Sequence, residues 1–175
     1  MPPEAADIFR TASRAASIMD AGQLEMLVVL EPHMQEVRLP AGAPIYKAGE
    51  PSDAIYVIDD GDVRVEVHSH EVDTDTVLEY RGAGSFLGDT GVLAKLPRWT
   101  SAYAHTDVLL HRVSADGLRR VYEESPAEGV AILRALSRDT ATRAERAARQ
   151  LADHLADDQP DPEVERLVAA AGAPQ

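Results

Sequence analysis

The stretch from Gly84 to Ala102, GSFLGDTGVLAKLPRWTSA, decides how this chain is interpreted. It holds too many glycines for a regular strand and too many apolar residues for a solvated loop, yet it carries one acid, Asp89, and one arginine, Arg98. The glycines at 88 and 91 would let the backbone approach a ligand closely, and TGVLAK is long enough for one or two helical turns. Free N–H groups at the start of such turns favour an anion, typically a phosphate.

Arg98 and Asp89 offer complementary chemistry for a phosphorylated sugar. A guanidinium directly after Pro97 could form a bidentate, charge-assisted pair with two phosphate oxygens, which the point charge of a lysine does not reproduce. A carboxylate repels phosphate but accepts a hydrogen bond from a sugar hydroxyl, as an acid does for ribose in dinucleotide sites. The alternative is structural: the glycines mark bulges and turns at a barrel corner, and the two charges lie on the surface.

The longer run from Gly84 to Val113, GSFLGDTGVLAKLPRWTSAYAHTDVLLHRV, resembles the phosphate-binding cassette and following strands of cyclic nucleotide-binding domains. This fold is shared by the bacterial catabolite activator protein and the regulatory subunit of cyclic AMP-dependent kinase. Upstream, AGEPSDAIYVIDDGDV is similar to the second conserved segment of the family, with its glycine turn at Gly61. The resemblance extends over about residues 10–157.

The resemblance implies a role for each residue of the cassette. Arg98 is expected to pair with the cyclic phosphate, and Gly88 and Asp89 to meet the ribose 2′-hydroxyl. Backbone amides near Gly91, Trp99 and Thr100 are expected to line the phosphate. The predicted ligand-binding residues are Gly88, Asp89, Thr90, Gly91, Val92, Arg98, Trp99, Thr100 and Arg143.

Two residues depart from the family pattern. Asp89 stands where the family usually has glutamate, so its carboxylate lies one methylene, about 1.5 Å, further back. Its bond to the ribose would then be longer or mediated by water. Trp99 replaces the usual alanine, serine or threonine directly after the arginine, and its indole must turn outward, stack on the base or block the site.

The choice of nucleotide and the cover over the base also follow from the resemblance. Relatives that prefer cyclic GMP carry a threonine at the position of Trp99, so its absence favours cyclic AMP, with cyclic GMP as the second candidate. The long C-terminal helix is expected to close over the base, with Thr140, Thr142 and Arg143 near the adenine. Arg143 is the predicted stacking residue; the alternative is a solvated surface position.

The rest of the chain is expected to form an α+β fold. From about Met34 to Val113 the apolar pattern has a period of two, with short runs separated by Gly, Pro, Asp and Ser, which predicts an antiparallel β-roll, also called a double-stranded β-helix or jelly roll. Helical segments precede and follow it. The expected divisions are N-terminal helices over 1–33, the roll over 34–113 with the cassette at 84–102, C-terminal helices over 114–157, and a flexible tail over 158–175.

Helix starts have specific signals in this sequence. Asp20 followed by Gln23 predicts a capping box, and Pro32 is expected to end that helix. Ser125, Pro126 and Glu128 combine a cap, a proline at the first helical position and a second capping box. The long helix that follows carries apolar or small residues three or four apart: Val130, Leu133, Leu136, Thr140, Ala144, Ala147, Leu151 and Leu155.

Composition limits the function classes. The chain has 175 residues and no cysteine, which excludes disulfides and thiolate catalysis, and its formal net charge of −13 opposes binding of nucleic acid without a concentrated basic patch. The N-terminus lacks the apolar core of a signal peptide, and the longest apolar run, Met26–Leu30, is too short for a membrane span. We therefore expect a cytoplasmic protein that binds neither nucleic acid nor membrane.

A metal site and a catalytic site have weaker support. HSHE at His68–Glu71 resembles the metal motif of cupin enzymes, with His105 or His111 as a late ligand, but Glu71 would point to the opposite face from His70. A solvated hairpin tip is the preferred reading, without metal or cofactor. No nucleophile elbow occurs, so no enzyme activity is expected. The tyrosines at 46, 56, 80, 103 and 122 are predicted to lie in the core.

These observations predict a cyclic nucleotide receptor that acts in signal transduction. Only residues 158–175 follow the long helix, and the resemblance implies that a winged helix-turn-helix would need more. Binding in the roll would reposition the C-terminal helix, which would also form a homodimer and act on an effector protein. Two alternatives stay open: an interaction module whose pocket Trp99 fills, and a cupin-like metalloenzyme.

Overall fold

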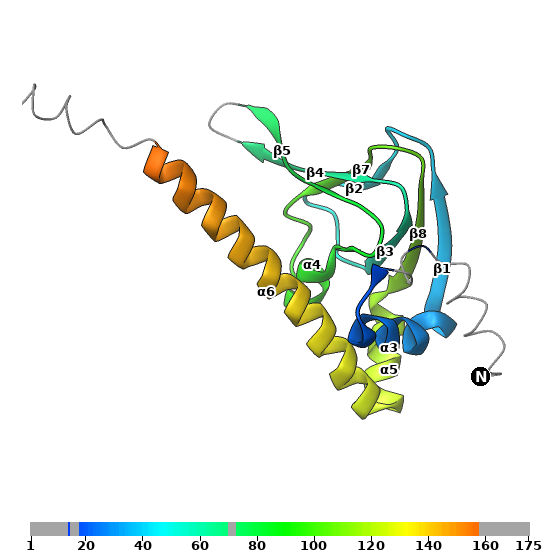
Figure 1. Cartoon of the computed structure of the whole chain (residues 1–175). Coiled ribbons are helices and arrows are strands. Elements are labelled where there is room, and N and C mark those ends of the chain that lie inside the picture. The colour runs from blue at the N-terminus through cyan, green and yellow to red at the C-terminus, as the bar shows by residue number, and fades with distance from the viewer. Residues whose placement is uncertain (1–13, 15–17, 70–72, 158–175) are drawn as a thin grey trace, which may run out of the picture. The chain divides into compact units, whose positions relative to one another are not determined.

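The computed structural model describes residues 14, 18–69 and 73–157, and these form eight strands in two antiparallel four-stranded sheets (Figure 1). The first sheet has the order β1 (Met34–Leu39), β8 (Val108–Ser114), β3 (Ala54–Asp60), β6 (Phe86–Leu87). The second has the order β2 (Pro44–Tyr46), β7 (Ser101–Ala104), β4 (Val63–Ser69), β5 (Thr74–Arg81). The predicted α+β architecture with an antiparallel β-roll is confirmed.

Strand β3 shows why the roll has two hydrophobic cores. Its residues from Ala54 to Asp59 are all buried, because both faces of the first sheet are covered. One face lies toward the second sheet and contributes Tyr56 and Ile58 to the core inside the roll. The other face contributes Ile55 and Val57 to a second core, shared with the helices. An unbroken apolar run is the pattern expected of a strand buried on both faces.

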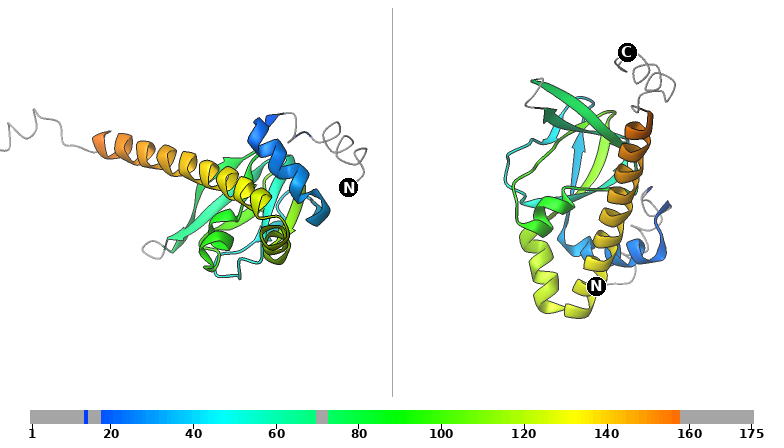
Figure 2. Two further views of the ribbon diagram at one scale, coloured as in Figure 1. Left: turned by 90° about the horizontal axis from the view of Figure 1, so that it is seen from below. Right: turned by 90° about the vertical axis from the view of Figure 1, so that its left-hand side faces the viewer.

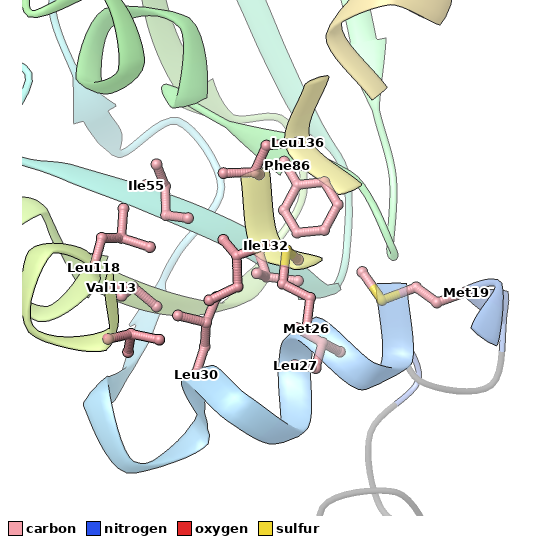
Figure 3. Close-up of a cluster of buried hydrophobic side chains, with 12 residues drawn as sticks. Met19, Met26, Leu27, Leu30, Ile55, Phe86, Val113, Leu118, Ile132 and Leu136 are labelled. Atoms are coloured by element: carbon pink, nitrogen blue, oxygen red, sulfur yellow. The ribbon is translucent and has the colours of Figure 1, made fainter. Parts of the chain in front are cut away.

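The second core brings together the helices of the first 139 residues. Figure 3 shows Met26, Leu27 and Leu30 of α3 (Ala21–Leu30) facing Phe86, with Ile132 and Leu136 of the long helix nearby. Leu118 and Val121 of α5 (Ala115–Glu124) complete it. Because Phe86 belongs to the cassette and is fully buried, this core anchors the start of the cassette.

The helix starts follow the sequence signals. Asp20 accepts a hydrogen bond from the Gln23 amide at 2.8 Å and donates its own amide to Gln23 Oε1 at 3.0 Å, which is the predicted capping box. Helix α3 ends at Leu30, and the short 3₁₀ helix η1 (Glu31–His33) contains Pro32. The long helix α6 (Pro126–Asp157) begins at the predicted proline, and Figure 2 shows how α5 runs into it.

Helix α6 belongs to two compact units that divide between Asp139 and Thr140. Within the first unit it has two apolar faces: Ile132 and Leu136 are buried in the helical core, whereas Val130 and Leu133 are exposed. The apolar residues that recur three or four apart along this helix therefore differ in burial. Among the residues described, no helix is long and apolar enough to span a bilayer.

The turn at Gly61 was predicted correctly, whereas the tyrosines were predicted only in part. Gly61 forms the turn between β3 and β4 with a φ of 83°, as DDGDV predicted. Tyr46 and Tyr56 are buried, but Tyr80 is exposed on the edge strand β5, where its ring meets His105 edge-on, so its prediction as a core residue was wrong. The predicted helical start of the chain before Arg14 and the tail at 158–175 lie outside the described residues.

Candidate ligand-binding site

The cassette forms a strand, a tight turn, a short helix and a loop. After β6, Gly88 adopts a left-handed conformation with a φ of 73° and lies immediately before α4 (Asp89–Ala94). A side chain is strained in this conformation, and space is also short, since a Cβ on Gly88 would lie 2.1 Å from Arg98 Nη1. The glycine therefore permits the close approach of arginine to the turn.

The backbone of Arg98 is fixed by a segment that comes about fifty residues earlier. The Arg98 amide donates to the Glu50 carbonyl at 2.8 Å, and the Gly49 amide donates to the Arg98 carbonyl at 2.7 Å. The Lys47 amide in turn donates to Glu50 Oε2 at 2.9 Å, which closes that turn. The position of the arginine thus depends on the loop between β2 and β3 as well as on the preceding proline.

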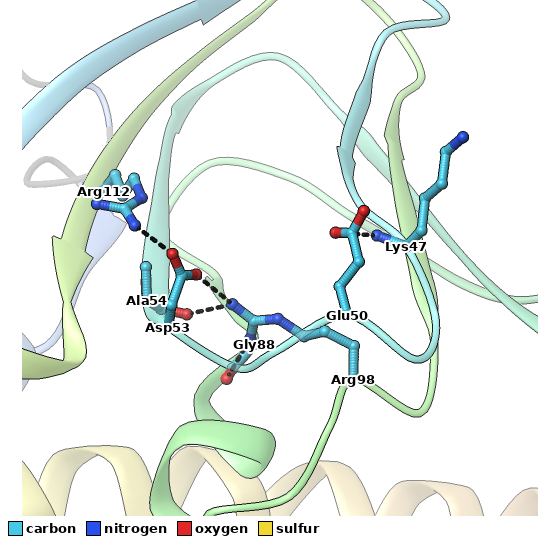
Figure 4. A network of polar contacts seen from close by, with 7 residues as sticks. All are labelled: Lys47, Glu50, Asp53, Ala54, Gly88, Arg98 and Arg112. Atoms are coloured by element: carbon cyan, nitrogen blue, oxygen red, sulfur yellow. Dashed lines mark hydrogen bonds and ion pairs between the residues drawn. The ribbon is translucent and has the colours of Figure 1, made fainter.

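The guanidinium of Arg98 points inward, as Figure 4 shows. Nη1 donates to the Gly88 carbonyl at 2.8 Å and Nη2 donates to the Ala54 carbonyl at 2.6 Å. Nη2 also lies 3.8 Å from Asp53 Oδ1, whose other oxygen accepts a 2.7 Å bond from Arg112 Nη2. The Arg98 side chain is 3% exposed and that of Asp53 is 63% exposed.

These contacts leave the positive charge of Arg98 incompletely balanced. Its two short bonds go to neutral carbonyls, and the Asp53 carboxylate is distant, solvated and shared with Arg112. The Nε atom is buried and has no hydrogen-bond partner among the described residues. A buried charge is costly unless it is paired and its donors are satisfied. The site is therefore suited to receiving an anion with oxygen acceptors.

Tyr46, the last residue of β2, lies beside the guanidinium of Arg98. Its ring centroid lies 4.4 Å from Arg98 Cζ and 6.2 Å from the ring centroid of Tyr56. Burial raises the pKa of the Tyr46 phenol above its ordinary value, against smaller opposing effects of Thr100, Arg81 and Arg98. The phenol is thus neutral at physiological pH, and the ring presents an uncharged π face to the cation.

The other predicted site residues lie around the same turn. Asp89 is 1% exposed, and its charge acts on the Tyr46 phenol. Gly91 and Thr100 are buried, Thr90 is exposed and Val92 is half-buried. Trp99 is 63% exposed. Of the three orientations expected for the indole, the outward one is observed.

Arg143 lies on α6 in the second compact unit. Its Nη2 is 3.4 Å from the Thr140 hydroxyl, within the same helix. Its contact with the base stays a prediction.

The histidines do not gather into a metal site in the part of the chain that the structure describes. His68 lies 3.1 Å from Asp75 and 3.4 Å from Asp73 at the hairpin tip, whereas His111 lies 3.5 Å from Asp59 in the first sheet. No group of three potential metal ligands occurs among the described residues. His70 and Glu71 of the cupin-like motif lie outside them.

Comparisons with known proteins identify the family. The family model for the cyclic nucleotide-binding domain matches residues 36–125. This chain belongs to that family. An uncharacterized NTE family protein of Mycobacterium tuberculosis is 32% identical over 130 residues, which is 74% of this chain and 21% of that protein. The chain thus spans about a fifth of the length of that relative.

Two further relatives support the assignment. The CRP-like cAMP-activated global transcriptional regulator of M. tuberculosis is 26% identical over 156 residues, covering 89% of this chain and 67% of the regulator. A crystal structure of a cyclic nucleotide-binding domain from Methylobacillus flagellatus has a TM-score of 0.74 at 20% identity and covers 90% of this chain and 88% of that one. At this identity the structural likeness shows the fold.

Sequence reasoning missed three contributors to the environment of Arg98 in this cyclic nucleotide-binding domain. Asp53 and the Ala54 carbonyl come from the start of β3, and Tyr46 comes from β2. The segment AGEPSD, which carries Asp53 and precedes Ala54, lies in the second conserved segment of the family, so the resemblance could have pointed to these two residues. No sequence signal distinguished Tyr46, because its apolar neighbours and its position in a strand are those of an ordinary core residue.

Substitution of Gly88 by alanine is expected to weaken cyclic nucleotide binding about tenfold. The new Cβ would lie 2.1 Å from Arg98 Nη1 and 3.3 Å from the Ala54 carbonyl oxygen, so the guanidinium must leave its present position. Gly42→Ala is the control, because Gly42 has a φ of 85° but nothing within 4 Å of the added Cβ. Calorimetric titration measures both affinities. Equal losses in the two variants would contradict the steric explanation.

Proposed function

We propose that this chain is a receptor for cyclic AMP, that the cyclic phosphate pairs with Arg98, and that binding regulates a partner protein. The observation that carries the proposal is the buried guanidinium of Arg98, whose Nε donor has no partner among the described residues and whose ion pair with Asp53 is long, at 3.8 Å. A cyclic phosphate supplies one negative charge and two exocyclic oxygens. Such a group fits a single arginine that retains an open donor.

The remaining parts of the proposal have separate support. The CRP-like regulator that this chain resembles is described as cAMP-activated, which favours cyclic AMP over cyclic GMP. The indole of Trp99 points outward and is 63% exposed, which favours a receptor over a module whose pocket this side chain fills. We propose a role in binding and signalling, without catalysis, because the cassette offers groups that hold an anion.

A second copy of the chain is the proposed first partner. Val130 and Leu133 of α6 are exposed, whereas Ile132 and Leu136 are buried. Apolar residues three apart on an exposed helix face fit the seam between two helices. Ligand can act on such a dimer, or on an effector protein, only if it favours one arrangement of the chain over another.

A thermal-shift screen tests the receptor proposal. Cyclic AMP at 100 times its Kd should stabilise the protein by about 2.7 kcal/mol, which raises the Tm of a domain of this size by about 5–10 °C. Cyclic GMP and a cyclic dinucleotide are included at equal concentrations, with AMP as the control that lacks the cyclic phosphate. A Tm that none of the cyclic nucleotides raises would contradict the proposal.

A further inference from the structure

An aromatic residue beside Arg98 has no role in either the sequence pattern or the proposed function. Tyr46 is the last residue of β2 and is almost fully buried. The centroid of its ring lies 4.4 Å from Arg98 Cζ, within the range at which a guanidinium is attracted to an aromatic face. The attraction is strongest where water is excluded, and both side chains are excluded from water here.

The contact with Tyr46 leaves the donors of Arg98 free for other partners. An aromatic face has no lone pair, so it stabilises the cation without accepting a conventional hydrogen bond. Nη1 and Nη2 donate to the Gly88 and Ala54 carbonyls, and Nε remains without an acceptor among the described residues. An anion can therefore bind Arg98 while the ring stays in contact with it.

We infer that Tyr46 is a positioning residue that holds the guanidinium of Arg98 ready for the anionic oxygens of the ligand. The inference rests on the proposed function, because it concerns the same arginine. Without the ring, the guanidinium would lose one of the contacts that hold it in place, and ligand binding would first have to restrict its orientation. Fixing a side chain before binding reduces that cost.

The neighbourhood of Tyr46 supports this role. Thr100 lies beside the phenol, and the charges of Arg81, Arg98 and Asp89 all act on it. The aromatic face, rather than the hydroxyl, is the part of Tyr46 that contacts the cation.

The test separates the ring from the hydroxyl and from general packing. Tyr46→Phe should bind cyclic AMP within about twofold of the wild type, whereas Tyr46→Leu should bind about tenfold more weakly. Phenylalanines with one, two and three ring fluorines at position 46 keep nearly the same shape but have progressively less electron density on the ring face. Their affinity should fall stepwise. Tyr122→Leu is the control for loss of a tyrosine packed in the core, because Tyr122 packs against the helical core, and it should leave the affinity unchanged.

The outcomes distinguish this inference from the proposed function. If the wild type binds cyclic AMP and the fluorinated series shows constant affinity, Tyr46 is only a packing residue and the inference is overturned. If the wild type binds no cyclic nucleotide, the proposed function fails, and with it the role of Tyr46 toward a ligand. A urea-unfolding cycle of Tyr46→Leu, Arg98→Met and the double variant then still tests the contact itself. The double variant should lose less free energy of unfolding than the two single variants lose in sum. Additive losses would contradict the contact between Tyr46 and Arg98.

Discussion

Arg98→Ala is expected to weaken cyclic AMP binding tenfold to more than a hundredfold. A charge-assisted hydrogen bond contributes about 1.5–3 kcal/mol, and every 1.4 kcal/mol is about tenfold in affinity. Arg98 is suited to the phosphate because its side chain is 3% exposed and Nε has no partner among the described residues. Isothermal titration calorimetry on the folded variant measures the loss directly.

Two matched variants are the controls for Arg98→Ala. Arg98→Lys keeps the charge but loses the planar fork, so its affinity should fall between those of the wild type and Arg98→Ala. Arg112→Ala removes another arginine that also pairs with Asp53, at 2.7 Å, and should change affinity by less than about threefold. Equal affinities of wild type and Arg98→Ala would exclude Arg98 as the phosphate partner. A large loss in Arg112→Ala would assign the effect to Asp53 instead.

Gly61→Ala is expected to reduce the free energy of unfolding by about 3–4 kcal/mol, the largest stability effect that we predict. Gly61 has a φ of 83°, which costs a residue with a side chain about 1–2 kcal/mol. Its added Cβ would also lie 2.2 Å from the Asp107 carbonyl oxygen and 2.9 Å from the Val108 side chain. Because backbone cannot move aside easily, the turn between β3 and β4 must separate from the loop before β8.

Gly42→Ala is the control that separates backbone strain from the clash. Gly42 has nearly the same φ, 85°, but open space around the added Cβ. It should therefore lose only about 1–2 kcal/mol. Urea unfolding of the two variants and the wild type measures both losses. If Gly61→Ala and Gly42→Ala are equally destabilised, the close approach of Asp107 to the turn does not add to the cost of a side chain at position 61.

Much of the fold could be predicted because its signals are local. The period of two between Met34 and Val113 identified the strands, and Asp20 with Gln23 and Pro126 marked two helix starts. Strand β6 was missed, since the two residues Phe86 and Leu87 are too few to show a period. The exposure of Tyr80 was also missed, because an edge strand and an inner strand have similar local sequences.

Local signals in the sequence were enough to predict the roll, the order of its elements and the glycine-bordered arginine, because backbone propensity and apolar period act between close neighbours in the chain. The surroundings of that arginine depend on residues that are distant in the sequence and meet in the folded chain. Tyr46, Asp53 and Gly88 meet Arg98 across separations of 52, 45 and 10 residues. Such long-range contacts select the rotamer of a long side chain. A local sequence pattern carries no information about them.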